Sequence, residues 1–399
     1  MRLRSFFDAI DLHRDEKFVS VRFRRPFRVI STSGASGGIA ENLDLVFNHQ
    51  SCEPKSHNLP DLVAAHRDAK TYVRVLTERG GVPGAAAAGL GTAANMNNLC
   101  IAEESFRELS VAALATGGVE TNAARAGDPA AFYECDGRFE RCRGEEAALP
   151  HGTINLIVLV NRPLADGALV RAVMTATEAK TAVLQERSVA SRQSAGLATG
   201  TGTDQIAIAA PAEGATPLTS AGHHAVLGEL IGRTVHDALA QTLAFQNRLA
   251  PLSQGSAGRL LERFGLAADD FIPRVAELLP PETAALARAN RLVIDREPMT
   301  VAAVAALVHI HDQIAWGMLP PLCWREAAVG HGALIAAAAA GRTDLSPVFR
   351  EGLARAVDAA DRDDPVFVAV HAAALGYAEK WTSTEAMLAG ALAAREGGC

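Results

Sequence analysis

Basic residues do not outnumber acidic ones in this sequence: 38 Lys and Arg stand against 45 Asp and Glu, a formal net charge of −7. Nucleic acids and anionic membranes bind basic surfaces, so we expect neither as a partner. The most apolar run, residues 332–341, is too short to span a bilayer. No apolar segment follows the basic start Met1 to Arg4, as it would in a signal peptide. The sequence therefore predicts a cytoplasmic protein.

The sequence also lacks a Cys-x-x-Cys pair, because its six cysteines are scattered. Cys135 and Cys142 flank Asp136-Gly137, a dipeptide typical of a two-residue hairpin turn. In such a hairpin Cys135 pairs with Arg138 and Cys142 with Ala131, so the two thiols do not face each other. We therefore expect reduced cysteines, with neither a disulfide nor a zinc site.

The length of 399 residues exceeds what one hydrophobic core usually serves, and an apolar fraction of 49% can fill sizeable cores. Residues 1–250 alternate strand and helix patterns. Residues 251–258 are rich in Pro, Gly and Ser, as in a linker. Residues 259–399 are rich in Ala and Leu, and Gly265, Gly341 and two Pro-Pro pairs divide them into six or seven expected helices. We expect a mixed domain over 1–250 and a helical domain of unassigned role over 259–399.

Within residues 1–250, short apolar runs alternate with two long helical patterns. Strands are predicted over residues 18–32, 43–49, 71–76, 109–116, 153–160 and 205–209, and a loop with a tightly packed helix over 81–96. Long helices are predicted over 164–187 and 220–249, the second with an N-cap at Thr219-Ser220. Antiparallel hairpins mixed with two long helices favour an α+β fold over a doubly wound parallel sheet.

The segment His151 to Pro211 holds three clusters of hydroxyl, amide and charged residues, joined by apolar elements. The clusters are residues 151–155 (HGTIN), 177–180 (TEAK) and 198–204 (ATGTGTD). Hydroxyls and glycines at the ends of apolar strands are typical of sites where backbone approaches a ligand closely. This segment is therefore the candidate site.

Lys180 lies on the apolar stripe of the predicted helix 164–187, about 20° from Leu169, whereas Glu178 points to the opposite face. A lysine directed at a core needs a carboxylate, a carbonyl or a ligand, because an unpaired buried ammonium is unfavourable. The alternative is that the stem of Lys180 follows the stripe and its ammonium reaches water at the edge.

The loop Thr199 to Asp204 resembles a phosphate-binding loop in composition, but it runs into a strand and has no lysine. Its three hydroxyls and terminal carboxylate suit an oxyanion hole, a threonine nucleophile, or hydrogen bonds to amide groups of a ligand. The alternative is a glycine-rich bend between strands.

Several histidines are candidates for acid–base or metal chemistry. His223 and His224 are predicted in the first turn of the helix 220–249, near its apolar stripe. The helix N-terminus disfavours an imidazolium there, so each is either a neutral base or a hydrogen-bonded core histidine. His309 and His311 are predicted on one helix, where positions i and i+2 diverge by about 200° and cannot share a metal. We expect no metal site.

Five motifs together resemble the adenosylcobinamide amidohydrolase family, in that family's order and approximate spacing over about residues 15–250. They are residues 121–128 (TNAARAGD), 152–155 (GTIN), 177–180 (TEAK), 199–204 (TGTGTD), and His224 followed by 227–232 (LGELIG). The resemblance implies corrinoid salvage: hydrolysis of the amide that joins aminopropanol to the corrin ring of adenosylcobinamide, giving adenosylcobyric acid and 1-aminopropan-2-ol. The corrinoid is then the substrate, and no cofactor is implied.

A corrin periphery carries many primary amides, so its site needs short hydrogen-bonding groups and glycines. We assign substrate binding to motif residues: Asn122, Arg125, Asp128, Glu178, Thr199, Gly200, Thr201, Gly202, Thr203 and Glu229. Amide hydrolysis needs an activated nucleophile, oxyanion stabilisation and a proton for the leaving amine. The catalytic candidates are His224, Asp204, Lys180, Asn155 and Thr153.

We hypothesise that His224 or Asp204 activates water or a threonine hydroxyl, and that Asn155, Lys180 and loop amides hold the oxyanion. As a base, Asp204 would be indispensable to turnover but not to the fold.

Two alternatives to this hydrolase stay open. The order Gly-Thr, strand, helix, Gly-Thr-Asp, strand also loosely resembles the self-processing aminopeptidases, an analogy for architecture alone. It predicts an αββα-like sandwich of mixed sheets and helices, followed by the all-α C-terminal domain. A self-processing N-terminal-threonine peptidase or acyltransferase would cleave before Thr153.

A non-catalytic corrinoid-binding protein would bind cobinamide without releasing aminopropanol. Homo-oligomerisation also stays open.

Overall fold

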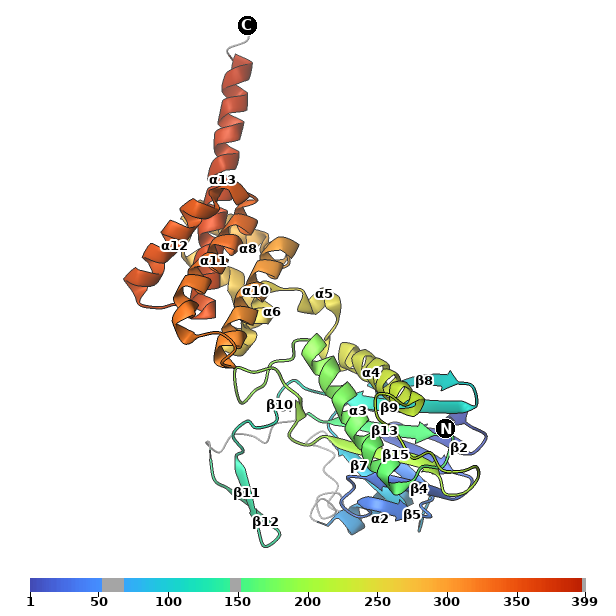
Figure 1. The fold of residues 1–399 in the computed structure, drawn as a ribbon. Coiled ribbons are helices and arrows are strands. Elements are labelled where there is room, and N and C mark those ends of the chain that lie inside the picture. Colours follow the sequence, from blue (N-terminus) through green and yellow to red (C-terminus); the bar gives the residue numbers. More distant parts are fainter. Residues whose placement is uncertain (52–67, 144–151, 397–399) are drawn as a thin grey trace. The chain divides into compact units, whose positions relative to one another are not determined.

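Two large β-sheets form the centre of residues 1–250 in the computed structural model, which describes residues 1–51, 68–143 and 152–396, with side chains as far as Trp381 (Figure 1). The five-stranded sheet has the order β1 (Arg2–Phe6), β2 (Ile10–Asp15), β3 (Phe18–Phe23), β6 (Leu45–Gln50), β7 (Ala87–Thr92). The six-stranded sheet has the order β5 (Gly38–Glu41), β4 (Phe27–Ser31), β15 (Gln205–Pro211), β13 (Ile154–Val160), β9 (Leu109–Gly117), β8 (Cys100–Phe106). Neighbouring strands run antiparallel except β6–β7 and β13–β15, which are parallel.

Successive side chains of a strand point to opposite faces of the sheet, and the apolar ones form three separate layers. Between the sheets, Val19 and Val46 pack with Leu114 and Ile157 in one buried cluster. The other face of β13, which includes Leu156, packs against α3 (Asp166–Glu186) and α4 (Val226–Asn247). Helix α2 (Ala69–Arg79) covers the outer face of the five-stranded sheet. The layers run helix, sheet, sheet, helices, so the predicted αββα sandwich is confirmed.

Helix α4 begins six residues later than predicted, with Ala225 rather than Ser220 before its first turn. Thr175 Oγ1 donates to the Ala221 carbonyl oxygen at 2.8 Å and holds this segment against α3. Gly228 packs so tightly beneath it that an added Cβ would lie 2.2 Å from the Gly222 carbonyl oxygen. These contacts keep residues 221–225 in a turn. The prediction that His223 and His224 lie on the helix is therefore wrong.

Three other predicted elements also differ from the structure. The run 18–32 is two strands, β3 and β4, in different sheets, because Pro26 cannot donate to a ladder. Residues 71–76 belong to helix α2, whose first turn is capped by Asp68. Residues 87–92 form strand β7 where a helix is predicted. Gly89 of this strand lies against the Phe47 ring, where a Cβ would approach to 2.4 Å.

The Asp136-Gly137 hairpin forms as predicted, from β11 (Phe132–Cys135) and β12 (Arg138–Arg141). Cys135 pairs with Arg138, and the Cys142 N–H donates to the Ala131 carbonyl oxygen at 2.9 Å. Both thiols are free, as the register requires.

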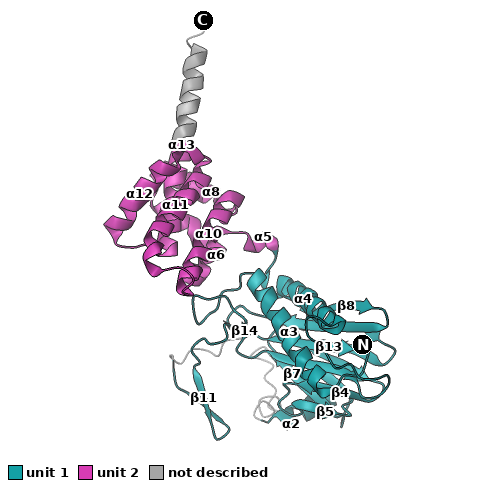
Figure 2. Cartoon of the chain, in the orientation of Figure 1, with its two compact units in different colours: residues 1–250 teal, residues 251–399 magenta. Residues whose placement is uncertain are grey.

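Residues 251–399 form a second compact unit, distinct from residues 1–250 (Figure 2). Its α-helices are α5 (Pro251–Gln254), α6 (Ala257–Leu261), α7 (Phe271–Glu277), α8 (Pro281–Ala289), α9 (Arg291–Asp295), α10 (Pro298–Ala315), α11 (Trp324–Ala340), α12 (Ser346–Ala360) and α13 (Pro365–Glu396). Residues 251–258, expected as a linker, are therefore largely helical. Pro281 is the first residue of α8, and Gly341 ends α11 in a left-handed conformation, as expected from the positions of proline and glycine in the sequence.

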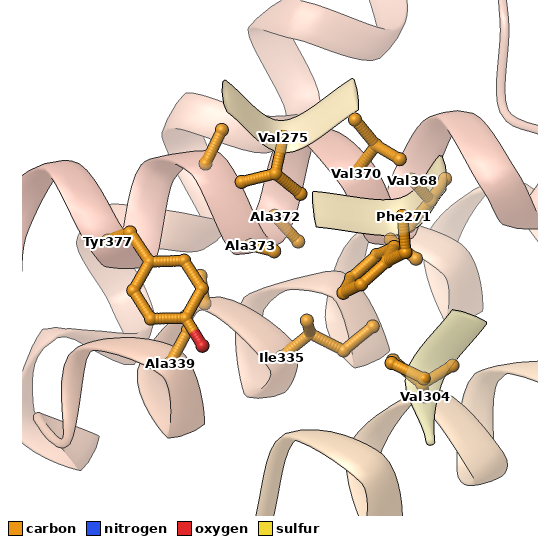
Figure 3. Close-up of a cluster of buried hydrophobic side chains, with 14 of the residues drawn as sticks. Phe271, Val275, Val304, Ile335, Ala339, Val368, Val370, Ala372, Ala373 and Tyr377 are labelled. Atoms are coloured by element: carbon orange, nitrogen blue, oxygen red, sulfur yellow. The ribbon is translucent and has the colours of Figure 1, made fainter. Parts of the chain in front are cut away.

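The helical unit has a core of its own, in which Phe271, Val304, Ile335 and Val368 are buried together with many alanines (Figure 3). Its all-α character confirms the prediction. None of the helices in the described residues combines the length and hydropathy that crossing a bilayer requires.

Candidate functional site

Four of the five sequence motifs meet at one end of the parallel pair β13–β15. Asn155 pairs with Gln205 in register, so residues 152–155 and 202–205 lie side by side where the two parallel strands begin. The short strands β10 (Ala123–Ala124) and β14 (Gly200–Thr201) pair antiparallel and add the motif 121–128. Helix α3, which carries residues 177–180, packs on this sheet and reaches the same end through Lys180.

Asp204 is the acceptor around which the loop 199–204 folds. One carboxylate oxygen accepts from Lys180 Nζ and from the Thr201 N–H at 3.1 Å. The other accepts from Thr201 Oγ1 at 2.5 Å and from the Ile154 N–H at 3.1 Å. The side chains of Lys180 and Asp204 are only 11% and 17% exposed. Lys180 thus finds the carboxylate partner that its place on the apolar stripe requires.

Two glycines of the loop 199–204 allow this close packing. A Cβ at Gly200 would lie 2.5 Å from Asp204 Oδ2 and 2.7 Å from Lys180 Nζ. A Cβ at Gly202 would lie 3.1 Å from Asn122 Oδ1. Only a residue without a side chain fits at Gly200 without displacing the ion pair.

A cluster of hydroxyls and one carboxamide surrounds the carbonyl oxygen of Gly152. The hydroxyls of Thr153 and Thr203 lie 2.5 Å apart, and each is within donating distance of this oxygen, at 2.7 and 2.9 Å. Asn122 Nδ2 donates to the same oxygen at 2.8 Å and to Thr203 Oγ1 at 3.1 Å. Gly152 has a φ of +141°, and a Cβ there would lie 2.7 Å from the Gly118 carbonyl oxygen.

Asn155 lies between the two sheets and is 1% exposed. Its Nδ2 donates to Asn48 Oδ1 at 2.8 Å and to the Gly91 carbonyl oxygen at 3.0 Å. Asn48 Nδ2 in turn donates to Thr116 Oγ1 at 2.8 Å. Both hydrogens of the Asn155 carboxamide are therefore used to join β13 to strands of the other sheet.

A cavity of about 1140 Å³ opens beside these groups, slightly larger than the usual pocket for a drug-sized ligand. Glycines, hydroxyls and carboxamides form much of its described wall. They include Gly89, Gly91, Thr92, Asn122, Gly152, Thr153, Gln193, Gly202, Thr203 and Gln205. Such a wall offers close backbone approach and many short hydrogen-bonding groups.

Three titratable side chains lie in the described wall of the cavity: Tyr72, Arg125 and Asp128. Burial raises the pKa of Tyr72, whose hydroxyl lies 3.0 Å from His49 Nδ1. Burial opposes ionisation of Asp128, but hydrogen bonds from two serines and the Arg125 N–H outweigh it and lower the pKa of this carboxyl. Asp128 is thus held as an anion at the base of the hairpin β11–β12.

Other predicted site residues lie outside the described wall of the cavity. His224 is exposed in the turn before α4. His223 Nε2 lies 2.7 Å from Glu178 Oε2, and both side chains are more than half exposed. Glu229 is also exposed and lies 3.5 Å from Arg233, one helical turn away.

The apolar residues of the fifth motif are buried in this structure. Leu227, Leu230 and Ile231 are buried in the layer between the sheet and α3–α4, and Gly228 is the close contact described above. The Thr199 hydroxyl accepts from the Ala126 N–H at 2.8 Å, and Thr199 is outside the described wall of the cavity.

Sequence analysis did not predict that Tyr72, Gln205 and the glycines of β7 line the cavity. Gln205 directly follows the last motif residue, Asp204, and the spacing Gly89-x-Gly91 was the available signal for a strand against a ligand. The described residues contain no group of three His, Cys, Asp or Glu side chains arranged to hold a metal ion.

A model of the adenosylcobinamide amidohydrolase family matches residues 4–251, which is more than half of the sequence and almost all of the αββα unit. The chain belongs to the adenosylcobinamide amidohydrolase family. The match of this amidohydrolase family ends where the helical unit begins.

Two further proteins are similar to this adenosylcobinamide amidohydrolase family member. One is the uncharacterized protein MJ1613 of Methanocaldococcus jannaschii, 34% identical over 242 residues, which are 59% of this chain and 89% of that protein. The other is the solved structure of the PH0078 protein from Pyrococcus horikoshii OT3, with a TM-score of 0.30 and 13% identity. It covers 57% of this chain and 77% of its own.

Proposed function

We propose that residues 1–250 hydrolyse the amide between aminopropanol and the corrin ring of adenosylcobinamide. The observation that carries the proposal is the cavity of about 1140 Å³ where four family motifs meet, whose described wall combines glycines, hydroxyls and carboxamides with several alanines, Pro129 and Phe132. A corrin ring is large and carries amides around its edge, which is the chemistry that such a wall binds. The corrinoid is the substrate in this proposal, and no cofactor is needed.

The reaction adds water across one amide bond. The carbon–nitrogen bond breaks, the hydroxyl of water stays on the carbonyl carbon, and a proton passes to the leaving amine. The proposed reaction centre is the hydroxyl pair of Thr153 and Thr203, because both residues line the cavity. The nucleophile is the Thr153 hydroxyl or a water beside it.

The contacts of the remaining candidates support positioning roles. Asp204 already accepts four hydrogen bonds or ion-pair contacts, and Lys180 is its partner, so the two hold the loop 199–204 in place. Asn155 donates both hydrogens of its carboxamide NH₂ group to protein acceptors, so it orients β13 against β7. The proposal leaves the exposed His224 outside the reaction.

The test is incubation of the full chain with adenosylcobinamide, followed by mass detection of adenosylcobyric acid and 1-aminopropan-2-ol. Thr153→Ala should lower turnover at least about 100-fold, whereas Thr153→Ser, which keeps the hydroxyl, should retain much of it. Thr216→Ala is the matched control, since Thr216 is exposed and lies outside the five motifs and the described wall of the cavity.

A mass increase of the protein by one corrinoid acyl group that Thr153→Ala abolishes would identify Thr153 as the nucleophile; no mass increase would favour water. Substrate binding without products would reject the hydrolase in favour of a corrinoid-binding protein. Two chain fragments split before Thr153 would instead indicate self-processing.

A further inference from the structure

Gln205 is a cavity residue that the reaction as proposed does not use. It is the first residue of β15, directly after Asp204, and its side chain lines the cavity. Its Oε1 accepts from the Gly91 N–H at 2.7 Å. A backbone N–H needs an acceptor, so the oxygen of the carboxamide faces Gly91 and the NH₂ group faces the other way.

The carboxamide of Gln205 is held in this orientation by its hydrogen bond to Gly91, whose own position is fixed by a second hydrogen bond. Strand β7 is the edge of the five-stranded sheet, so within the described residues one side of it has no neighbouring strand. There, the Gly91 N–H donates to Gln205 and the Gly91 carbonyl oxygen accepts from Asn155. Asn155 and Gln205 are themselves register partners on β13 and β15. The described residues offer the Nε2 of Gln205 no acceptor, which leaves its hydrogens to the cavity.

The donor of Gln205 and the hydroxyl pair lie in the wall of the same cavity. Asn155 and Gln205 are the first register partners of β13 and β15. Thr153 and Thr203, whose hydroxyls lie 2.5 Å apart, each come two residues before one of these partners. Because Thr153, Thr203 and Gln205 all line the cavity, a ligand that reaches the hydroxyl pair also passes the Gln205 donor.

We propose that Gln205 is a specificity-determining residue that donates a hydrogen bond to a carbonyl oxygen on the edge of the bound corrinoid, in the same cavity wall as the hydroxyl pair that meets the hydrolysed amide. This inference rests on the proposed function for the identity of the ligand. It gives Gln205 a role in binding the substrate, not in stabilising the transition state. A donor that contacts both states equally changes KM and leaves kcat unchanged.

The test compares Gln205→Glu with Gln246→Glu in the full chain. Gln205→Glu keeps an acceptor for Gly91 but removes the NH₂ donor. Gln246 offers a matched control, because its Oε1 also accepts a backbone N–H, from Asn95 at 3.1 Å, and it is outside the described wall of the cavity. Gln205→Met, similar in length and uncharged, guards against an effect of the new charge, and thermal unfolding verifies that each variant is folded.

Equilibrium binding of adenosylcobinamide is measured by calorimetry with each glutamine substitution placed in the Thr153→Ala background, because a chain that hydrolyses the ligand reaches no binding equilibrium. Turnover is measured by product mass with Thr153 present. We expect both Gln205 variants to raise Kd and KM about tenfold, with kcat unchanged and Gln246→Glu like the wild type. Unchanged binding by folded Gln205 variants, or a fall in kcat at constant KM, would overturn the inference.

Because binding is measured separately, failure of the proposed function is recognisable. A wild type that binds adenosylcobinamide without hydrolysing it would reject the hydrolase, and the binding comparison would still decide the role of Gln205. A wild type that does not bind adenosylcobinamide would overturn both.

Discussion

Gly200 shows how a single residue position decides whether the site can form. A Cβ at this position would meet both partners of the Lys180–Asp204 pair, at 2.7 and 2.5 Å. Gly200→Ala should therefore lower the free energy of unfolding by about 2 kcal/mol, measured by chemical denaturation, and should also lower turnover. Gly232→Ala is the control: it lies in α4 with no atom within 4 Å of the added Cβ, and alanine favours helix. Equal loss of stability in both variants would contradict this account.

Asp204 was expected to be dispensable for the fold, and its contacts lead to the opposite prediction. All four of the groups that contact its carboxylate are donors, and they belong to Lys180, Ile154 and Thr201. In Asp204→Asn an NH₂ group would face a donor and the Lys180 ammonium would lose its counter-charge. We expect a loss of about 3 kcal/mol in denaturation experiments, along with lost turnover. Asp361→Asn, at an exposed left-handed position that asparagine tolerates, should leave stability unchanged.

At the scale of elements, the hairpin β11–β12 forms a sheet of its own with every residue exposed. Phe132 lines the cavity, and the Arg141 guanidinium lies 4.8 Å from the centre of its ring. A ring of this size at a cavity wall gains burial when a ligand binds. Phe132→Ala should therefore raise KM several-fold with kcat unchanged. Phe139→Ala, on the same hairpin and 71% exposed, should leave both constants unchanged.

The helices α3 and α4 are joined by a histidine whose contribution to stability depends on pH. His236 Nε2 lies 2.8 Å from Glu186 Oε2, and Nδ1 lies 3.0 Å from Asp237 Oδ1. Burial lowers the pKa of His236, but the hydrogen bonds to these two carboxylates outweigh it and raise the pKa above 6.5. The stabilisation is therefore fully present below the unfolded-state pKa, and it is lost as pH rises through the higher folded-state pKa.

His236→Gln should accordingly unfold at lower denaturant concentration than wild type near pH 5.5 and at the same concentration near pH 9. Because the ring is about one third exposed, the difference at low pH should stay below about 1 kcal/mol. Glu186→Gln should show the same pH dependence, and a difference that persists at high pH would refute the role of the ion pair.

The elements that the sequence predicted well are those whose pattern has one interpretation. The faces of α3 follow from the helical period, so Lys180 could be placed on the buried stripe without any tertiary information. Residues 71–76 could not be assigned in this way, because a short apolar run fits a strand or one face of a helix equally well. The glycines of β7 weakened its strand pattern, although packing against Phe47 requires one of them.

At the scale of the whole molecule, the two units have separate cores. The buried clusters of the sandwich draw on residues 6–243, and the buried cluster of the helical unit begins at Ala257. A chain of residues 1–250 should therefore fold by itself and release aminopropanol at the rate of the full chain. Calorimetry of the full chain should contain the unfolding transition of this fragment. Aggregation or loss of activity of the fragment would show that it depends on residues 251–399.

The sequence by itself determined the all-α unit through local periodicity, and the family and its motif residues through residue order. The αββα layers were predicted only from the resemblance to the self-processing aminopeptidases, because residue patterns alone gave no more than an α+β fold. Only the tertiary structure decided which motif residues line the cavity together. The register of β13 with β15 joins Thr153 to Thr203 and places Gln205 beside Asn155, whereas the turn before α4 leaves His224 in solvent. Such contacts depend on how strands far apart in the sequence are aligned, and a shift of one residue would turn each side chain to the other face.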